Sequence, residues 1–366
     1  MKWTHTVGSI LADNWKLVRG NNLNGHQLKH LNLMSRCHTA SLGGTVNECQ
    51  KCSEISYTYH SCRNRHCPSC GGSKREQWIE RQQSYLMDTS YYHVVFTMPK
   101  DLNTLCMYTP RVMFDALFKA SWMTIQTFAS DHKYLGAQTG MTAVLHTWSQ
   151  NMCLHPHLHC IVPGGGVTKH GKWKYSRSKG KYLFPVKAMA AVYKGIFMAE
   201  LKRLAKIGAI ELPPELRESL YKKQWVVYAK RPFAKPDHVI EYLGRYTHKV
   251  AISNHRLLQY DSEYVLFNWK DYRKGAKVGV MELETSEFIR RLSMHILPHK
   301  FVRIRHYGLL SFHARSKTIP LIQAKQNYIP RISPVYILPA RILQCHKCKS
   351  QKIVSTPSHP TKTRSP

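Results

Sequence analysis

The sequence predicts an α+β protein that begins with a small metal-held module, and three observations support this prediction. Strand-like and helical runs alternate between about residue 88 and residue 275, as in a domain that packs helices on a sheet. The segment before about residue 80 is rich in cysteine but has little apolar periodicity, so it needs a metal to hold it together. The chain is 43% hydrophobic, which is enough to bury a core and excludes disorder throughout.

The local pattern predicts the elements of the central segment one by one. Residues 91–98 form a β-branched and aromatic run that ends at Pro99, which is typical of a strand. Residues 110–129 begin with proline and have the periodicity of a helix. The other expected elements are strands at 141–148 and 158–162, a hairpin over 168–184, a helix at 186–206, a strand at 225–228, a helix at 237–250, a strand at 264–269 and a helix at 282–297.

The charge of the chain points to an anionic partner. Lys and Arg number 54 and Asp and Glu number 21, which gives a net charge of +33. Such an excess opposes compaction, and nucleic acid is the first candidate to offset it. The sequence contains no run of 18 apolar residues, so we expect no membrane span and no membrane partner. The first 20 residues lack the apolar stretch of a secretion signal, so we expect an intracellular protein.

Two cysteine pairs predict a structural zinc site. Cys49-x-x-Cys52 and Cys67-x-x-Cys70 are separated by 14 residues. Zn²⁺ takes four thiolate or imidazole ligands in a tetrahedron, and two such pairs supply them with the chain looping between. Four protein ligands leave no open position, so this zinc is expected to be structural rather than catalytic.

Other metal-ligating residues near these pairs leave the number of zinc ions open. A second zinc ion could be held by four of them, namely Cys37, His60, Cys62 and His66. A further pair, Cys345-x-x-Cys348, has no partner pair nearby in the sequence. It could join the N-terminal site in space or bind nothing.

Two histidines in the middle of the chain predict a catalytic metal site. His157 and His159 alternate with apolar residues, and on a strand residues i and i+2 face the same way, about 6.6 Å apart. Two imidazoles and one further ligand leave positions open for substrate oxygens and water. Gln150 is the expected third ligand, with His146 and His155 as alternatives close by in the sequence.

Two tyrosines are the candidate nucleophiles. Tyr242 and Tyr246 are four residues apart, which on a helix places both phenols on one face. Gly244 between them costs a helix about 1 kcal/mol relative to alanine, and it leaves space for a close approach. Lys249 follows and favours a phosphate nearby. The alternative is an amphipathic helix with two half-buried tyrosines.

Together these residues resemble a known family. His157-Leu158-His159 resembles the histidine–hydrophobic–histidine (HUH) motif of rolling-circle single-strand endonucleases, and Tyr242-x-x-x-Tyr246 resembles their two-tyrosine motif. From about residue 35 to residue 312 the chain is similar to the transposases of the IS91 insertion-sequence family. The segments that carry this similarity are SCRNRHCPSC, HPHLHCIVPGGG, EYLGRYTHKVAISNHR, WKDYRKG and FVRIRHYGLLS.

The resemblance implies a fold and a reaction. The fold is an HUH endonuclease-like antiparallel sheet with flanking helices, preceded by a small zinc-binding module. The implied reaction cleaves and rejoins single-stranded DNA at element ends, with Mg²⁺ or Mn²⁺ on the histidines and a 5′-phosphotyrosyl intermediate. Lys249 is expected to stabilise an attacking or departing oxyanion. The implied partners are transposon-end and target DNA, in the cytoplasm of a bacterium and associated with the nucleoid.

The chain then divides into four expected parts. They are a zinc-binding and DNA-binding module at 1–85, a catalytic domain at 86–275, a basic region at 276–354 and a disordered tail at 355–366. Five arginines from these parts are expected to contact DNA, although a solvated face explains Arg63 and Arg65 as well. The five are Arg63, Arg65, Arg245, Arg303 and Arg305.

Two other classes of protein remain as alternatives, together with a near neighbour within the favoured class. A zinc-finger regulator without catalysis explains the charge and the cysteines, but gives no reason for the histidine and tyrosine pairs. A metal-dependent hydrolase that uses His155, His157 and His159 predicts no covalent intermediate. A plasmid replication initiator or relaxase is the nearest neighbour within the favoured class, and the N-terminal zinc module favours the transposase.

Overall fold

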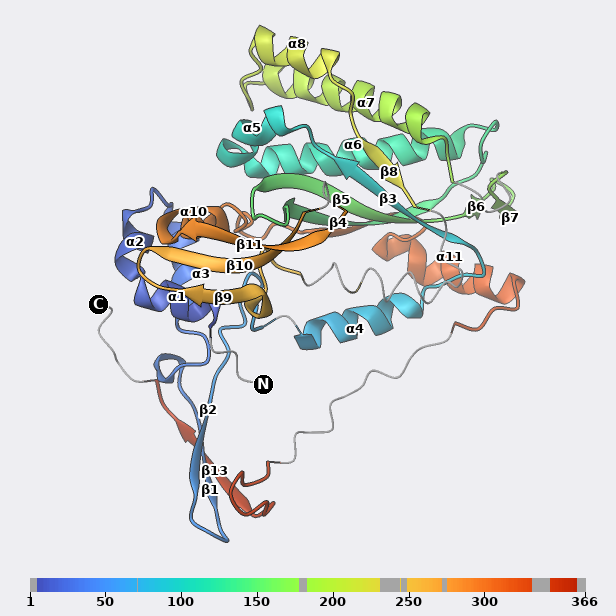
Figure 1. Ribbon diagram of the computed structural model, residues 1–366. Coiled ribbons are helices and arrows are strands. Elements are labelled where there is room, and N and C mark those ends of the chain that lie inside the picture. The colour runs from blue at the N-terminus through green and yellow to red at the C-terminus, as the bar shows by residue number, and fades with distance from the viewer. Residues whose placement is uncertain are drawn as a thin grey trace.

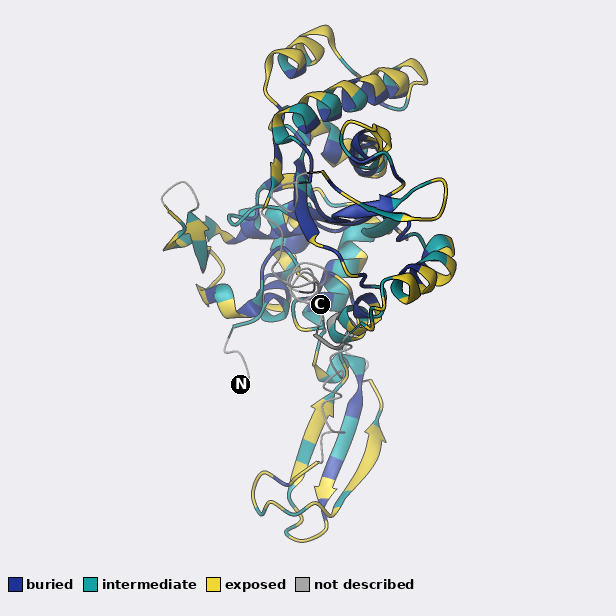
Figure 2. Ribbon diagram, turned by 90° about the vertical axis from the view of Figure 1, so that its right-hand side faces the viewer, coloured by how far each residue is buried: buried dark blue, intermediate teal, exposed yellow. Residues whose placement is uncertain are grey.

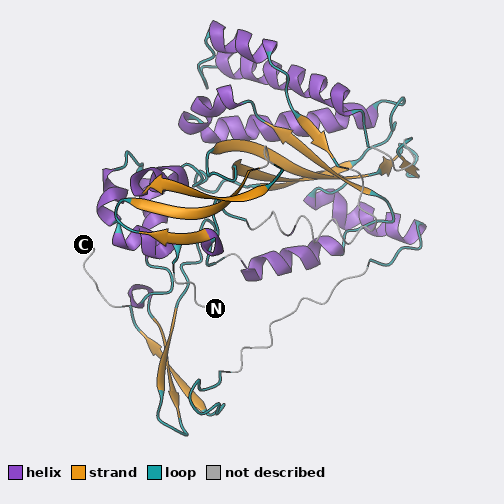
Figure 3. Ribbon diagram, viewed as in Figure 1, coloured by secondary structure: helices purple, strands orange, loops and turns teal. Residues whose placement is uncertain are grey.

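The computed structural model describes residues 5–70, 72–177, 183–230, 244, 249–271, 275–330 and 343–360. A central sheet lies between two layers of helices, a smaller sheet with its own helices lies beside it, and a narrow three-stranded arm projects away from both (Figures 1 and 3). No helix in this part of the chain has the length and apolar character needed to cross a membrane.

The central sheet has five antiparallel strands in the order β12-β4-β5-β3-β8. Its strands are β3 (Tyr91–Thr97), β4 (Gly140–Trp148), β5 (Leu154–Pro163), β8 (Val227–Ala229) and β12 (Ile304–Gly308). The antiparallel α+β architecture is thus confirmed. The long strands β4 and β5 occupy the middle of the sheet, so side chains on them are held by neighbours on both sides.

One face of this sheet packs on a layer of helices. This layer contains α5 (Asn103–Tyr108), α6 (Pro110–Ser130), α7 (Val186–Lys206) and α8 (Pro214–Lys222), preceded by the 3₁₀ turn η2 (Lys100–Leu102). Leu158, Cys160 and Val162 of β5 are fully buried in the core between sheet and helices. The apolar residues that alternate with the two histidines therefore point inward, as the strand period predicts.

The other face of the sheet is covered in part by α4 (Gly72–Gln83) and α11 (Phe312–Lys325) (Figure 1). Trp78 and Ile79 of α4 pack against Val144 of β4 and Ile161 of β5. A short hairpin of β6 (Gly165–Val167) and β7 (Trp173–Tyr175) follows β5, and begins earlier than the hairpin expected at 168–184.

The smaller sheet has the order β11-β10-β9. Its strands are β9 (Leu257–Tyr260), β10 (Tyr264–Asp271) and β11 (Lys277–Glu284), with the 3₁₀ turn η3 (Asn254–Arg256) before them. Helix α10 (Thr285–Ser293) follows β11. The helix expected at 282–297 therefore begins later, because residues 277–284 alternate between exposed and half-buried positions as an edge strand does.

The N-terminal helices belong to this second body. They are α1 (Val7–Asp13), α2 (Trp15–Gly20) and α3 (Gly25–Ser35). Val7, Ile10 and Leu31 share a core with Phe267 of β10 and Phe288 of α10. This core joins the N-terminal helices to residues 252–296 and so spans the expected boundaries at residues 85 and 275.

The arm is a three-stranded sheet in the order β13-β1-β2. After the turn η1 (Ala40–Leu42) come β1 (Gly44–Cys49) and β2 (Ile55–Tyr59), and β13 (Ile353–Ser358) pairs with β1 from Gly44↔Ser358 to Cys49↔Ile353. The expectation of a disordered tail from residue 355 is therefore wrong for residues 355–358. Much of the arm surface is exposed (Figure 2).

Candidate functional site

Three histidines from two neighbouring strands converge on one face of the central sheet. His146 lies on β4, and His157 and His159 lie two residues apart on β5. One ring nitrogen of each lies within 4.8 Å of the others, and Nε2 of His157 is 3.2 Å from Nε2 of His159. Strand periodicity accounts for the β5 pair. His146 joins them because it is the direct partner of His157 in the β4–β5 register.

Hydrogen bonds around β5 determine which ring nitrogens face the cluster. Nδ1 of His157 lies 2.7 Å from the carbonyl oxygen of His155. Because a carbonyl oxygen only accepts, Nδ1 carries the proton and Nε2 of His157 keeps a lone pair. Nδ1 of His159 lies 2.9 Å from Nε2 of His93 on β3, and its Nε2 is the nitrogen near His157. His155 thus contributes its carbonyl group, while its side chain is exposed.

Burial keeps the imidazoles of His157 and His159 neutral. Burial lowers the pKa of His157 to about 4. Burial also moves the pKa of His159 far below its ordinary value, and electrostatic repulsion from His146 and from Lys249 acts in the same direction. Neutral imidazole is the form that binds a metal.

A second layer of rings surrounds the three histidines. The ring of His93 is stacked on that of His159, with centroids 5.1 Å apart and 11° between the planes. Trp148 is stacked on His146, with centroids 4.5 Å apart. His93 was not among the predicted site residues, because its contact with His159 depends on the pairing of β3 with β5. The sequence does show a histidine within the strand expected at 91–98. It does not show how that strand pairs with the strand that carries His159.

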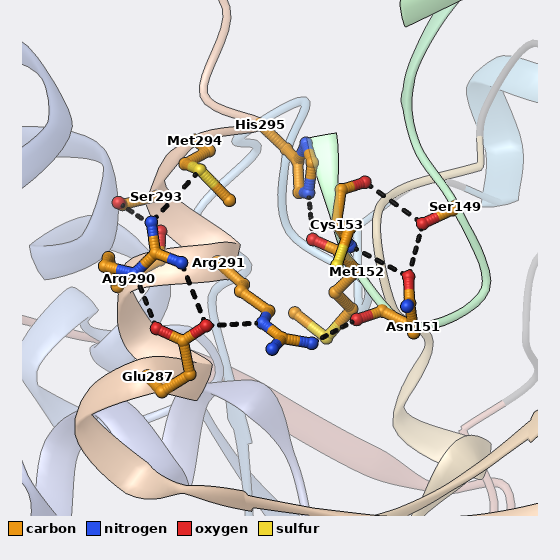
Figure 4. A network of polar contacts seen from close by, with 10 residues as sticks. All are labelled: Ser149, Asn151, Met152, Cys153, Glu287, Arg290, Arg291, Ser293, Met294 and His295. Carbon is orange, nitrogen blue, oxygen red and sulfur yellow. Dashed lines mark hydrogen bonds and ion pairs between the residues drawn. The ribbon is translucent and has the colours of Figure 1, made fainter. Parts of the chain in front are cut away.

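The turn that joins β4 and β5 is fastened to α10 and the residues after it (Figure 4). Nη1 of Arg291 donates to the carbonyl oxygen of Asn151 at 2.9 Å, and Nε2 of His295 lies 2.9 Å from the carbonyl oxygen of Met152. These contacts hold the ends of both histidine-bearing strands. Gln150, the expected third ligand, lies in this turn beyond the end of β4, whereas His146 lies within the cluster.

Four cysteines near the base of the arm form a set that fits a zinc ion. Their Sγ atoms all lie within 4.8 Å of one another. The Sγ of Cys70 is 3.5 Å from that of Cys37 and 3.6 Å from that of Cys62. Four thiol groups so close together are the donor set of a closed structural zinc site. The set is Cys37, Cys62, Cys67 and Cys70.

The expected zinc set of Cys49, Cys52, Cys67 and Cys70 is not brought together. Cys49 ends β1 and Cys52 lies in the turn after it, and a six-residue strand spans about 20 Å. Their thiols therefore lie at the far end of the arm from the other two, beside the C-terminal Cys-x-x-Cys pair.

The alternative second set is brought together only in part. Cys37 and Cys62 are neighbours, but neither expected histidine belongs to their cluster. Nε of Arg65 donates to Nε2 of His66 at 3.3 Å, and His60 lies at the end of the arm strand β2.

Comparison with known proteins identifies the family. A family model described as "Transposase zinc-binding domain" matches residues 10–98, and one described as "Putative transposase" matches residues 140–318. A "Putative transposase y4qJ" of Sinorhizobium fredii is 40% identical over 305 residues, which cover 80% of this chain and 76% of the relative. The chain belongs to the IS91 family of transposases. The zinc-binding match contains all four cysteines at the base of the arm.

Other similar proteins are more distant from this transposase. The "Transposase for insertion sequence element IS801" of Pseudomonas savastanoi pv. phaseolicola is 28% identical over 321 residues, covering 84% of this chain and 75% of the relative. Among solved structures, the conjugative relaxase TrwC in complex with oriT DNA matches with a TM-score of 0.27 and 10% identity. That match covers 56% of this chain and 86% of the relaxase.

The two tyrosines of the transposase motif, Tyr242 and Tyr246, lie outside the described residues. Gly244 between them is described, is helical and is buried. A Cβ atom at this position would lie 2.3 Å from Cδ1 of Ile79 on α4. The lack of a side chain at Gly244 therefore allows its backbone to lie against α4, which packs on the same face of the sheet as the histidines.

The basic residues of the transposase have different surroundings. Arg63 is exposed, with φ of 52°, and Arg245 lies outside the described residues. Arg65 donates to the carbonyl oxygens of Phe301 at 2.6 Å and Pro298 at 3.2 Å. Its contacts thus fasten the cysteine-rich segment to the chain before β12.

The two arginines around β12 also make contacts within the protein. Arg305 pairs with Asp115 at 2.5 Å and lies over the ring of Phe118, 4.1 Å from its centroid. Arg303 donates to the carbonyl oxygen of Lys249 at 3.3 Å. Arg305 therefore stabilises the fold, and Arg303 holds the backbone next to the histidine cluster.

Proposed function

We propose that this transposase cleaves and rejoins single-stranded DNA by attack of a tyrosine on a phosphate placed at the three-histidine cluster. The convergence of His146, His157 and His159 carries the proposal. These imidazoles lie on the face of the sheet opposite its largest core, beside the smaller buried cluster that contains Val144 and Ile161.

The cluster has the chemistry of a divalent metal site. Three nitrogen donors leave coordination positions open, in contrast to the four thiols of the zinc site. Of the two ions expected, Mn²⁺ fits better, because Mg²⁺ prefers oxygen ligands in a near-ideal octahedron. When bound, the ion supplies positive charge that stabilises the negative charge developing on the scissile phosphate. We assign the third ligand to His146, one of the two alternatives to Gln150, because it lies within the cluster.

The chain itself supplies the nucleophile. The phenol oxygen of Tyr242 or Tyr246 forms a bond to phosphorus, and the bond from phosphorus to the 3′ oxygen breaks. The phenol loses its proton, and the 3′ oxygen gains one. The product is a 5′-phosphotyrosyl link and a free 3′ hydroxyl, so the energy of the phosphodiester is kept for rejoining.

Two observations support a position of the tyrosine pair near the cluster. Gly244 lies against Ile79, which packs on the histidine face of the sheet. On the other side of the tyrosines, Lys249 is close enough for its charge to lower the pKa of His159. An exposed ammonium group there is suited to stabilise an oxyanion of the reacting phosphate.

The experiment is incubation of the full chain with a labelled single-stranded oligonucleotide of an element end and Mn²⁺. The proposal predicts a protein–DNA adduct that survives denaturation, and its loss when the metal is chelated. Cleavage without an adduct would instead support a hydrolase in which water attacks. A duplex of the same sequence, run in parallel, should give little or no adduct.

A further inference from the structure

The far end of the arm holds a second cluster of four cysteines, drawn from the two ends of the chain. Cys49 ends β1, Cys52 lies in the turn before β2, and Cys345 and Cys348 lie shortly before β13. The Sγ of Cys49 is 3.5 Å from that of Cys348, and the Sγ of Cys52 is 3.5 Å from that of Cys345. All four sulfur atoms lie within 4.8 Å of one another, and none belongs to a disulfide.

The two Cys-x-x-Cys segments have the same backbone turn. The N–H of Ser53 donates to the carbonyl oxygen of Cys49 at 2.8 Å, and the N–H of Lys349 donates to that of Cys345 at 2.9 Å. Ser53 and Lys349 occupy the same place after each pair, and both are left-handed, with φ of 57° and 58°. Non-glycine residues rarely adopt this conformation, so its repetition indicates that both segments are shaped for one purpose.

The hydrogen bonds that close the turns are repeated as well. The N–H of Cys49 donates to the carbonyl oxygen of Glu54 at 3.0 Å, and the N–H of Cys345 donates to that of Ser350 at 2.9 Å. Two matching turns that face each other with four thiols between them are the arrangement that a tetrahedral metal requires. With Zn–S bonds of about 2.3 Å, neighbouring sulfur atoms lie about 3.8 Å apart, close to the observed 3.5 Å.

We propose that Cys49, Cys52, Cys345 and Cys348 bind a second structural zinc ion, separate from the one at the base of the arm. The matched zinc-binding domain ends at residue 98, so this site needs a segment far outside it. The ion would fasten the C-terminal segment to the N-terminal hairpin and allow β13 to pair with β1.

The arm has little else to hold it together. Ile55, Tyr57 and Val354 are exposed on its surface, so the arm buries little apolar area. Glu54 pairs with His346 at 3.3 Å and with Lys347 at 3.7 Å, but ion pairs this exposed contribute little. Metal binding is therefore the main source of its folding free energy.

The test is the zinc content of the purified full-length chain and its variants. The wild type should hold two zinc ions per chain. The double variant Cys345→Ser/Cys348→Ser, the double variant Cys49→Ser/Cys52→Ser and the quadruple variant should each hold one. Cys153→Ser, a half-buried cysteine outside both clusters, is the matched control and should hold two.

The zinc content of the same variants also distinguishes the proposed four-cysteine site from a site in which Cys49 and Cys52 share a zinc ion with other residues. One zinc ion in the wild type would overturn the proposal. So would a Cys345→Ser/Cys348→Ser variant that keeps two ions, since Cys49 and Cys52 would then have other partners.

A second measurement on the wild type covers the case in which a variant does not fold. The thiols of Cys345 and Cys348 should resist alkylation by iodoacetamide until a zinc chelator is added, as read by mass spectrometry. Equal alkylation of these two thiols with and without the chelator would overturn the proposal.

Discussion

Nε2 of His93 lies 2.9 Å from Nδ1 of His159, and the two rings are stacked across the β3–β5 pair. The contact joins β3, on which no metal ligand was predicted, to β5, which carries the predicted ligands His157 and His159. It orients the imidazole of His159 so that Nε2 faces His157. Partners of this kind tune a metal site without touching the metal.

Replacing His93 should weaken metal binding more than it changes the reaction. His93→Phe keeps a ring but removes the hydrogen bond, so we expect the Mn²⁺ concentration for half-maximal cleavage to rise about 10–100-fold. Saturating Mn²⁺ should restore most of the rate. His93→Gln, which can still form a hydrogen bond, should remain within a few fold of the wild type. An unchanged Mn²⁺ requirement in His93→Phe would show that the contact has no such role.

Two substitutions decide whether His146 or Gln150 is the third ligand of the catalytic metal. His146→Ala should abolish cleavage, because it removes one of three nitrogen donors, while the circular dichroism spectrum and the zinc content stay unchanged. Gln150→Ala should cleave at nearly the wild-type rate, because this residue lies in the turn beyond β4. The reverse pattern would restore Gln150 as the ligand.

Gly244→Ala should destabilise the protein, although alanine is the better helix former. The added Cβ would lie 2.3 Å from Cδ1 of Ile79, and overpacking of this kind costs about 1–3 kcal/mol. Thermal unfolding should show a lower Tm and cleavage should fall. The second change Ile79→Val, which removes Cδ1, should recover part of both losses. If Gly244→Ala alone has the wild-type Tm, the close contact of Gly244 with Ile79 is wrong.

Binding to single-stranded DNA should fall steeply with salt. Each phosphate neutralised on a single strand contributes a slope of about −0.7 to the plot of log affinity against log salt concentration. With a net charge of +33, we expect five or more contacts and a slope steeper than about −3.5. Fluorescence anisotropy between 50 and 300 mM salt, roughly the range where the slope is linear, measures it. A nearly flat plot would remove nucleic acid as the main partner.

Local sequence patterns correctly predicted features that depend only on nearby residues, such as the faces of a strand and the ends of a helix. The period of two in residues 157–162 placed two histidines on one face and the apolar residues in the core, and both hold in the structure. The proline at the start of α6 and the apolar stripe of α7 gave these two long helices nearly to the residue.

The sequence pattern did not predict which segments far apart in the chain lie side by side in the fold. His146 and His93 reach the site through strand register, and a register cannot be read from either strand alone. The two zinc knuckles of the sequence prediction are each real turns, but a hairpin of about 20 Å separates them. Arg65 and Arg305 were expected to contact DNA, and only the fold reveals the carbonyl groups and the carboxylate that they contact.

The central claim is that a tyrosine of the pair at 242 and 246 becomes covalently joined to DNA, and one measurement tests it most directly. Wild type, Tyr242→Phe, Tyr246→Phe and the double variant are incubated with the same labelled single strand and Mn²⁺. Adducts are separated under denaturing conditions, and the modified peptide is identified by mass spectrometry. We predict an adduct on one of the two tyrosines in the wild type and no adduct in the double variant, which should still bind DNA. An adduct of wild-type yield in the double variant would contradict the claim.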